Sequence, residues 1–300
     1  MSQRINLGWI GLGQMGAPMA ERLLGEDVNL HVFDLGADVM EAFVSKGAVA
    51  HASPQSVADA AEIVFACLPS PAISERVAFG PDGVAKGQKI RLYVETSTIG
   101  SRCIQAIGAE LAKRDIVTVD GPISGGAPAA REGRLTMMVS GNPHAVEEVT
   151  PWLARIGRQV TCLGPQPGQA QIMKLVNNMV MAANMVVASE GLSLGSKAGL
   201  DVAAMMEVLS ASTGSSRALT EILVRALQPG TQNFGAHLSI VQKDVALGVS
   251  EATALGVSLP ALDAVRAVWT AAAAGELAKQ DFTCILRYIE QQAGTEVRVG

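Results

Sequence analysis

Cysteine, histidine and aromatic residues are all scarce in this chain. Aromatic side chains make up 4% of its 300 residues, and it contains 4 cysteines and 4 histidines. The cysteines are far apart and form no CxxC pair or Cys/His cluster, which argues against a disulfide framework and a zinc site. The histidines have no regularly spaced carboxylate partners, so a histidine-based dehydrogenase or metal site is disfavoured. We therefore expect reduced thiols, a reducing cytoplasm and no bound metal.

Positive charge is also in short supply. The chain has 23 Lys and Arg against 28 Asp and Glu, a formal net charge of -5. This charge does not favour binding to nucleic acid or to an anionic membrane. The N-terminal residues are polar and lead directly into a strand pattern, so no signal peptide is expected. The most apolar later run, residues 175–188, contains three asparagines and is too short to span a bilayer. The expectation is a cytoplasmic protein without nucleic-acid or membrane partners.

Apolar residues, at 49% of the chain, are ample for a large core. In the first half they form short β-rich runs that alternate with helical patterns. The predicted strands are residues 5–10, 30–33, 63–67, 92–94 and 116–119, and the predicted helices are 15–24, 38–46, 57–61 and 102–113. This alternation is typical of βαβ units, so we predict a Rossmann-type, doubly wound, mostly parallel sheet covered on both faces.

A cluster of proline and glycine at residues 164–168 marks a change in the sequence. The stretch that follows is poor in proline, rich in Ala, Met and Leu, and shows no strand alternation. We predict a dinucleotide-binding domain over residues 1–165 and an all-helical substrate and oligomerisation domain over 166–300. A long helix from near Gly168 to about Lys197 is expected to join them or to form an interface.

The first predicted strand runs directly into a glycine-rich turn with the pattern GxGxxG. Its residues are Gly11, Leu12, Gly13, Gln14, Met15 and Gly16. In a dinucleotide-binding fold the first glycine permits the tight turn, the second lets the backbone approach a pyrophosphate, and the third lets the helix pack on the strand. The N-terminus of the helix then faces the phosphates. The alternative is a glycine turn in an unrelated α/β fold.

Asp34 ends the next predicted strand, 23 residues after Gly11. A carboxylate there can accept hydrogen bonds from both ribose hydroxyls, whereas it would repel a 2′-phosphate. NADP sites usually offer an arginine nearby, but here Leu35, Gly36 and Ala37 follow. The sequence therefore favours NAD over NADP as the cofactor. The alternative is that Asp34 only caps the next helix.

Four separated segments in a fixed order span nearly the whole chain. They are residues 11–20 (GLGQMGAPMA), 120–126 (DGPISGG), 168–178 (GQAQIMKLVNN) and Lys243-Asp244 with Leu247. Together they resemble the β-hydroxyacid dehydrogenase family, which includes 3-hydroxyisobutyrate dehydrogenases and tartronate semialdehyde reductases. The family patterns are GLGxMGxPMA, DxPVSGG, GxGQxxKxxNN and KDxxLA. Ala170 departs from them, because it stands where the second glycine of GxGQ is usual.

The resemblance implies roles for particular residues. Lys174 would be the catalytic lysine, Asn178 would hydrogen-bond the substrate, and Lys243 would lie near the nicotinamide end of the cofactor. The substrate carboxylate would be bound by Ser124, Gly125 and Gly126, and further cofactor contacts would come from Leu68, Pro69 and Thr98. Family members usually associate, and the second domain is apolar and rich in small residues, so we expect a homodimer or homotetramer.

The residue chemistry agrees with these roles. On a helix, Lys174 and Asn178 are separated by four positions and lie on one face. A lysine can donate a proton and, once neutral, accept one. The Ser-Gly-Gly run after Pro122 reads as a bare-backbone loop suited to an anion. The alternatives are an exposed helix lysine at Lys174, an ordinary turn at the glycines and a solvated lysine at Lys243.

We therefore predict an oxidoreductase that transfers a hydride between NAD and a small, carboxylate-bearing 3-hydroxy acid, such as 3-hydroxyisobutyrate. The reverse reaction, a semialdehyde or glyoxylate-type reduction, would use the same residues. An imine reductase shares this architecture but generally lacks the lysine. A phosphogluconate-type decarboxylating dehydrogenase would need a basic phosphate-binding cluster. A non-catalytic dinucleotide-binding homologue is disfavoured by Lys174 and Asn178.

Overall fold

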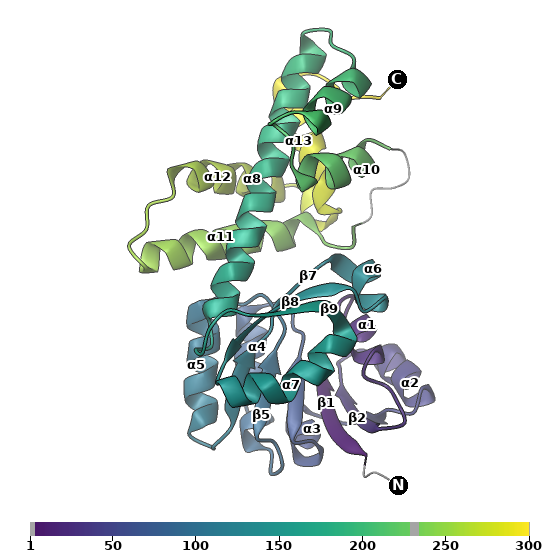
Figure 1. Ribbon diagram of the computed structural model, residues 1–300, viewed down its shortest axis with the longest axis vertical. Coiled ribbons are helices and arrows are strands. Elements are labelled where there is room, and N and C mark those ends of the chain that lie inside the picture. The colour runs from purple at the N-terminus through teal and green to yellow at the C-terminus, as the bar shows by residue number, and fades with distance from the viewer. Residues whose placement is uncertain (1–3, 229–233, 300) are drawn as a thin grey trace. The chain divides into compact units, whose positions relative to one another are not determined.

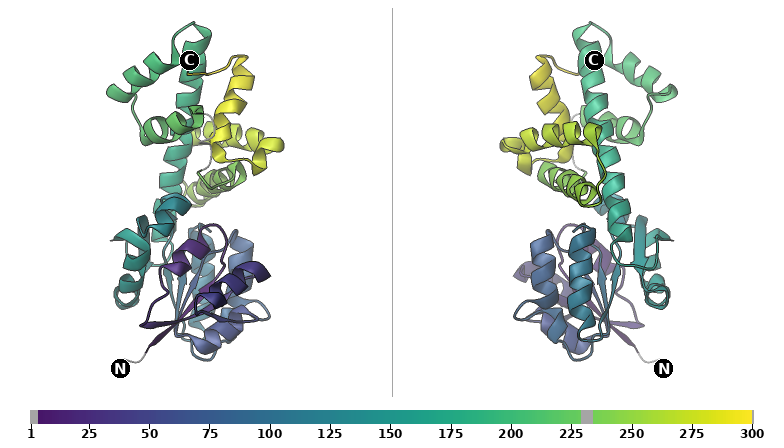
Figure 2. Two further views of the ribbon diagram at one scale, coloured as in Figure 1. Left: turned by 90° about the vertical axis from the view of Figure 1, so that its right-hand side faces the viewer. Right: turned by 90° about the vertical axis from the view of Figure 1, so that its left-hand side faces the viewer.

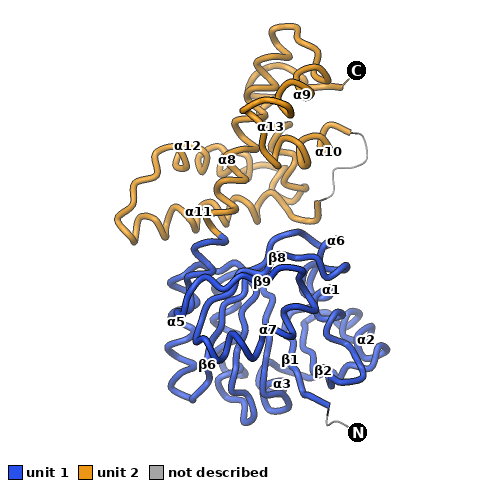
Figure 3. The backbone as a smooth tube through the Cα atoms, viewed as in Figure 1, with its two compact units in different colours: residues 1–174 blue, residues 175–300 orange. Residues whose placement is uncertain are grey.

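The computed structural model describes residues 4–228 and 234–299 (Figure 1). The chain divides into two compact units, residues 1–174 and 175–300 (Figure 3). The predicted boundary near residue 165 falls in the turn before the long helix α8 (Gln169–Lys197), whereas the units divide within that helix. The assignment of separate roles to the two domains stays a prediction.

Unit 1 is built on a nine-stranded sheet. Its strands are β1 (Ile5–Ile10), β2 (Val28–Phe33), β3 (Val49–Ala50), β4 (Ile63–Ala66), β5 (Leu92–Glu95), β6 (Val117–Asp120), β7 (Ile123–Ser124), β8 (Leu135–Gly141) and β9 (Gly157–Cys162). The order across the sheet is β3-β2-β1-β4-β5-β6-β8-β7, and β9 also pairs with β8. Neighbouring strands from β3 to β6 are parallel, while β8 is antiparallel to β6 and β7. The direction of winding changes between β1 and β4, which is where doubly wound folds bind ligands.

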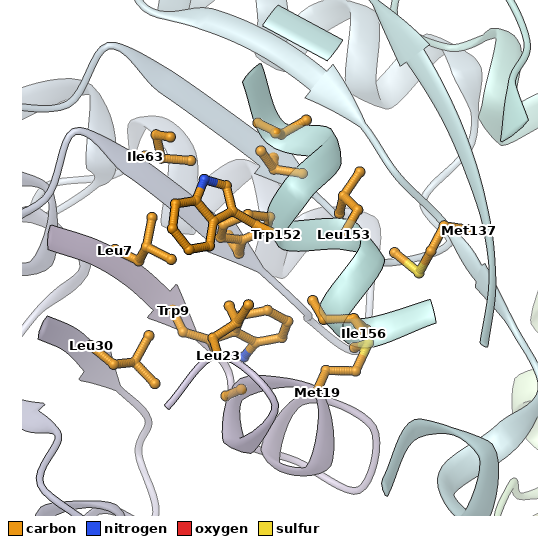
Figure 4. Close-up of a cluster of buried hydrophobic side chains, with 14 of the residues drawn as sticks. Leu7, Trp9, Met19, Leu23, Leu30, Ile63, Met137, Trp152, Leu153 and Ile156 are labelled. Carbon is orange, nitrogen blue, oxygen red and sulfur yellow. The ribbon is translucent and has the colours of Figure 1, made fainter. Parts of the chain in front are cut away.

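Helices cover both faces of this sheet (Figure 2). They are α1 (Gly16–Glu21), α2 (Ala37–Ser45), α3 (Pro54–Ala60), α4 (Pro71–Phe79), α5 (Ser101–Ala112), α6 (Gly126–Arg131) and α7 (Pro143–Ile156). Successive strand side chains point to opposite faces. Trp9 and Phe65 therefore join Met19 of α1 and Trp152 of α7 in one core (Figure 4), whereas Ile10 packs in a second core with residues of α3, α4 and α5. Burial on both faces explains why a central strand such as β4 is a continuous apolar run.

The predicted fold class is confirmed, and all five predicted strands are present. The first one matches β1 at both ends. The prediction omitted β3, β7, β8 and β9 and the helices α4, α6 and α7. β7 has two residues and β9 carries mostly exposed polar side chains, so neither forms an apolar run. α4 could have been found from Ser70, whose side chain caps the helix ahead of Pro71.

As predicted, all the regular elements in the described residues of unit 2 are helices, apart from one isolated bridge between His237 and Asp281. Besides the larger part of α8 it contains α9 (Val202–Ala211), α10 (Val224–Leu227), α11 (Leu238–Ala254), α12 (Pro260–Ala273) and α13 (Ile285–Ala293). Short helical segments lie at Ala218–Leu223, Glu276–Lys279 and Phe282–Cys284. Its core gathers around Trp269 of α12, whose indole nitrogen donates to the carbonyl of Ala182 on α8 at 3.3 Å.

α8 is longer than the apolar run 175–188 on which the membrane expectation depended. Within the described part of the chain it is the helix that is long and apolar enough to cross a membrane, with a mean hydropathy of 1.3 over its most apolar window. The run 175–188 alone is too short to span a bilayer, but this argument from length does not extend to the whole helix. Buried core helices of soluble proteins have the same length and composition, and 44% of this window is buried.

Candidate active site

The glycine loop after β1 is shaped by close backbone contacts. Gly11 has a φ of 92°, and a Cβ there would lie 2.2 Å from the carbonyl oxygen of Cys67. A Cβ on Gly16 would lie 2.0 Å from the carbonyl oxygen of Gly11. A Cβ on Gly13, in contrast, would meet nothing within 4 Å. The first and third glycines therefore let strand and helix pack, and the second leaves open space over the backbone. This cradle fits the pyrophosphate of a dinucleotide.

Asp34 follows β2 and contacts the glycine loop. Its Oδ2 accepts a hydrogen bond from the backbone N–H of Leu12 at 2.6 Å, and its Oδ1 accepts one from Gly36 N–H at 2.7 Å. The N-cap of α2 is Gly36, with no side-chain capping bond. Asp34 therefore does not act as the helix cap that the alternative interpretation required. Its carboxylate lies beside the loop, where a ribose is expected.

The loops that follow β4 and β5 are tied together. The hydroxyl of Ser97 accepts a hydrogen bond from Leu68 N–H at 2.6 Å and donates to Glu95. Glu95 is fully buried at the end of β5, and it also accepts from the hydroxyl of Tyr93 at 2.9 Å. Burial raises the pKa of Glu95, although these hydrogen bonds oppose the rise. Thr98, the predicted cofactor contact in this segment, is half-buried, between more deeply buried neighbours.

The Ser-Gly-Gly run is a strand-to-helix junction, and the prediction of a loop there was wrong. Ser124 ends β7 and pairs with Thr136 of β8. Gly125, with a φ of 140°, is the N-cap of α6, and Gly126, with a φ of 73°, is its first residue. Both values lie where side chains are disfavoured, which explains the paired glycines. Gly125 is exposed, while Ser124 and Gly126 are half-buried. Their role with a substrate carboxylate stays a prediction.

A buried carboxylate anchors the start of α8. Asp120, at the end of β6, is 0% exposed, and its Oδ2 accepts a hydrogen bond from Gln171 N–H at 3.0 Å. Its Oδ1 accepts from the hydroxyl of Ser140 at 2.5 Å, and Ser140 in turn accepts from Ala170 N–H at 2.8 Å. Gly168, with a φ of 104°, makes the turn into the helix. The departure at Ala170 therefore leaves the entry to α8 intact.

The titration of Asp120 should be visible in the stability of the protein. Burial raises its pKa from 3.8 to about 6, against hydrogen bonds from Ser140, Gly168 and Gln171. The folded state thus binds this proton more tightly, so the contribution of Asp120 to stability is full below the unfolded pKa and falls as pH rises to the folded one. The quantity to follow is the difference in free energy of unfolding between the wild type and Asp120→Asn. We expect this difference to fall by on the order of 2–3 kcal/mol between about pH 4 and pH 7. Urea denaturation across this range measures it, and a difference independent of pH would contradict the assignment.

In unit 2, a second buried carboxylate holds two of the predicted site residues. Asp244 of α11 is 4% exposed, and its Oδ2 accepts a hydrogen bond from Asn178 Nδ2 at 2.6 Å. Lys243 Nζ lies 2.8 Å from Asp244 Oδ1. Asn178 Oδ1 accepts from Asn177 Nδ2 at 3.1 Å. Lys243 therefore forms an ion pair with a buried partner, and hydrogen bonds on both sides hold the Asn178 amide in one orientation. Lys174 lies one turn earlier on α8.

The structure thus assigns partners to the predicted residues that sequence reasoning did not anticipate. Asp120, Gln171 and Asp244 all stood inside the recognised segments without a role. Each of the three side chains is polar and at most 4% exposed. A polar residue in an apolar stretch is the signal that could have indicated them. The described residues contain no group of three or more His, Cys, Asp and Glu side chains that could hold a metal ion.

A doubly wound sheet, a glycine cradle and an acidic residue beside it define the class of dinucleotide-dependent oxidoreductases. Comparison with known proteins agrees. Residues 6–164 match the model of the NAD-binding domain of 6-phosphogluconate dehydrogenase. Residues 168–289 match that of the NAD-binding domain of NADP-dependent 3-hydroxyisobutyrate dehydrogenase.

Full-length relatives identify the family. The chain is 33% identical to 2-(hydroxymethyl)glutarate dehydrogenase of Eubacterium barkeri, over 100% of both chains. It is 32% identical to 2-hydroxy-3-oxopropionate reductase of Escherichia coli, over 96% of this chain and 98% of the relative. A crystal structure of 3-hydroxyisobutyrate dehydrogenase from Salmonella typhimurium superposes with a TM-score of 0.82 at 25% identity, over 95% and 99% of the two chains. The chain belongs to the 3-hydroxyisobutyrate dehydrogenase, or β-hydroxyacid dehydrogenase, family of NAD(P)-dependent enzymes.

Proposed function

We propose that this enzyme oxidises a small 3-hydroxy acid, similar to 3-hydroxyisobutyrate, to the aldehyde or keto acid with NAD, or catalyses the reverse reduction. The observation that carries the proposal is the position of Lys174. It lies on a turn of α8 whose start is hydrogen-bonded to Asp120 and to the segment that presents Thr98. The helical turn that carries the proposed proton acceptor is therefore linked by hydrogen bonds to a predicted cofactor loop.

In this proposal each step is assigned to residues of the chain. The neutral amine of Lys174 takes the proton of the substrate hydroxyl, and as an ammonium it returns that proton in the reverse direction. Ser124 and the backbone N–H groups of Gly125 and Gly126 hold the substrate carboxylate, while Asn178 orients the hydroxyl. The bound dinucleotide supplies the hydride acceptor, nicotinamide C4. Its pyrophosphate would be held by the loop from Gly11 to Gly16.

The substrate beyond its carboxylate and hydroxyl groups is best found by a screen. Small 3-hydroxy acids, among them 2-(hydroxymethyl)glutarate and 3-hydroxyisobutyrate, are offered with NAD and with NADP. Tartronate semialdehyde is offered with the reduced cofactors, because the Escherichia coli relative is named for that reaction in the reducing direction. Turnover of at least one hydroxy acid or semialdehyde supports the proposal. Activity restricted to imines would contradict it.

We propose that NAD is preferred over NADP. The Asp34 carboxylate beside the glycine loop would repel a 2′-phosphate, and the residue that follows is Leu35, with a side chain that cannot pair with one. Asp34→Ala is expected to reduce the NAD over NADP ratio of kcat/KM by about tenfold or more, the scale of one lost charged hydrogen bond. Steady-state kinetics with both cofactors test this. Higher kcat/KM with NADP in the unchanged protein would contradict the preference.

We further propose a cytoplasmic homodimer or homotetramer that uses the exposed face of α8. Val176, Val180, Val187 and Leu194 are all exposed, with side chains 40% to 74% accessible, and recur at spacings of four and seven residues. Such a stripe is typical of a helix that packs against another helix.

Light scattering is expected to give a multiple of the 31.1 kDa chain mass. A double variant, Val180→Asp with Val187→Asp, should shift the species toward monomer, because two charges would be buried in the interface. Val44→Asp, at an exposed valine of α2, is the matched control. A monomer of unchanged sequence at micromolar concentration would contradict the oligomer.

A further inference from the structure

Gln171 is a fully buried amide on the first turn of α8. Its side chain has 0% exposure, and a buried amide without partners costs free energy. All the partners are backbone groups of the segment 97–100. Oε1 accepts from the N–H groups of Ile99 at 3.0 Å and Gly100 at 3.1 Å, and Nε2 donates to the carbonyl of Ser97 at 2.9 Å. Gln171 therefore holds the peptide groups on both sides of Thr98.

The segment that Gln171 holds is the connection between β5 and α5. Ser97 and Ile99 are 5% and 0% exposed, whereas Thr98 between them is half-buried. Thr98 is thus the residue that this segment offers to a ligand. Through its hydroxyl, Ser97 also binds the backbone of Leu68 at 2.6 Å. The same amide therefore supports, directly or through Ser97, both of the predicted cofactor loops.

The turn of α8 that carries Gln171 also carries Lys174. Residues three apart on a helix are neighbours on one face, so fixing this turn at Gln171 also fixes the direction in which the Lys174 side chain leaves the helix. The backbone N–H of Gln171 donates to the buried Asp120 at 3.0 Å. With its backbone and its side chain both hydrogen-bonded to sheet-end segments of unit 1, this turn cannot rotate without breaking several buried bonds.

We propose that Gln171 is a positioning residue, which sets the Thr98 segment against the turn of α8 that carries Lys174. The inference deepens the proposed function and rests on it for the role of Lys174. Proton removal and hydride loss occur at adjacent atoms of the substrate, and a misplacement of about 1 Å between reacting groups costs on the order of 10²-fold in rate. An amide that bridges the two protein segments is suited to prevent this.

The test compares Gln171→Met, which removes all three side-chain bonds at similar volume, with Gln169→Met. Gln169 is two residues earlier and exposed, and its amide oxygen accepts from Gln166 N–H at 3.0 Å within the preceding turn. For Gln171→Met we expect NADH or NADPH, whichever the wild type binds more tightly, to bind about tenfold more weakly in a fluorescence titration. We expect kcat to fall on the order of 10²-fold, with a smaller change in KM. Gln169→Met should match the wild type.

Gln171→Glu provides a second variant in which the same chain is compared at two pH values. A protonated carboxyl offers one donor to Ser97 and one acceptor to Ile99 and Gly100, whereas the carboxylate offers no donor. Relative to the wild type at each pH, cofactor affinity and kcat should therefore recover as pH falls. If Gln171→Met does not fold, this recovery decides the proposal.

Two results would overturn the positioning role. One is a folded Gln171→Met that binds and turns over like the wild type. The other is a loss of kcat that only follows the loss of folded protein, together with a Glu variant that shows no recovery at low pH. The titration needs no substrate, so it still tests Gln171 if the wild type turns over no hydroxy acid. That outcome would refute the proposed function alone.

Discussion

Replacing Lys174 with alanine is expected to lower kcat by about 10²-fold or more, the scale of a lost general base, while cofactor affinity changes little. The lysine is proposed to take the substrate proton, whereas the cofactor cradle at Gly11 to Gly16 lies on a different element, the loop after β1. The fall should be in kcat and in kcat/KM equally, because the interaction develops during the reaction. The measurements are steady-state kinetics on a responsive 3-hydroxy acid and a cofactor titration.

Two further lysine variants serve as comparisons for the effect of Lys174→Ala on kcat. Lys113→Ala removes an exposed lysine of unit 1, paired with Glu110, and should leave kcat unchanged. Lys243→Ala should disturb binding as well as rate, because it leaves the buried Asp244 without its ion pair. Near-normal turnover in Lys174→Ala would refute its assignment. A folded and cofactor-binding Lys174→Ala without activity would support it.

Replacing Gly13 with alanine is expected to weaken dinucleotide binding about 10- to 100-fold and to leave folding stability nearly unchanged. The new Cβ meets no protein atom within 4 Å, so the protein alone tolerates it. A pyrophosphate that approaches the backbone at this point would meet the methyl group. The measurements are NADH titration and the midpoint of thermal unfolding without cofactor.

Gly16→Ala is the matched comparison for Gly13→Ala. Its Cβ would lie 2.0 Å from the carbonyl oxygen of Gly11, which is backbone and which also accepts from the Trp9 indole at 2.8 Å. This variant should lose on the order of 3 kcal/mol or more of stability, because the clash can be relieved only by moving α1 or the strand end. If Gly13→Ala binds the cofactor normally, the pyrophosphate does not lie over Gly13.

Much of the fold is encoded locally and could be predicted. The strands β1, β2, β4, β5 and β6 are rich in buried apolar residues because both faces of the sheet are covered. The glycine loop could be predicted because its pattern directly follows a predicted strand, although the close contact that excludes a side chain at Gly11 comes from Cys67, which is distant in the sequence. The position of Asp34 follows from the strand that it ends. By contrast, β7 and β9 pair with β8 without an apolar pattern of their own.

What the sequence by itself determined about this protein is therefore its class, its glycine loop and the helix that carries Lys174 and Asn178. The tertiary structure decided which groups hold these residues in place. Gln171 with Ser97, Asp120 with Ser140, and Asn178 with Asp244 are each separated by at least 20 residues along the chain. A buried polar side chain needs a partner within the protein, because burial removes water as the alternative. Which group comes within hydrogen-bonding distance depends on the packing of the tertiary structure.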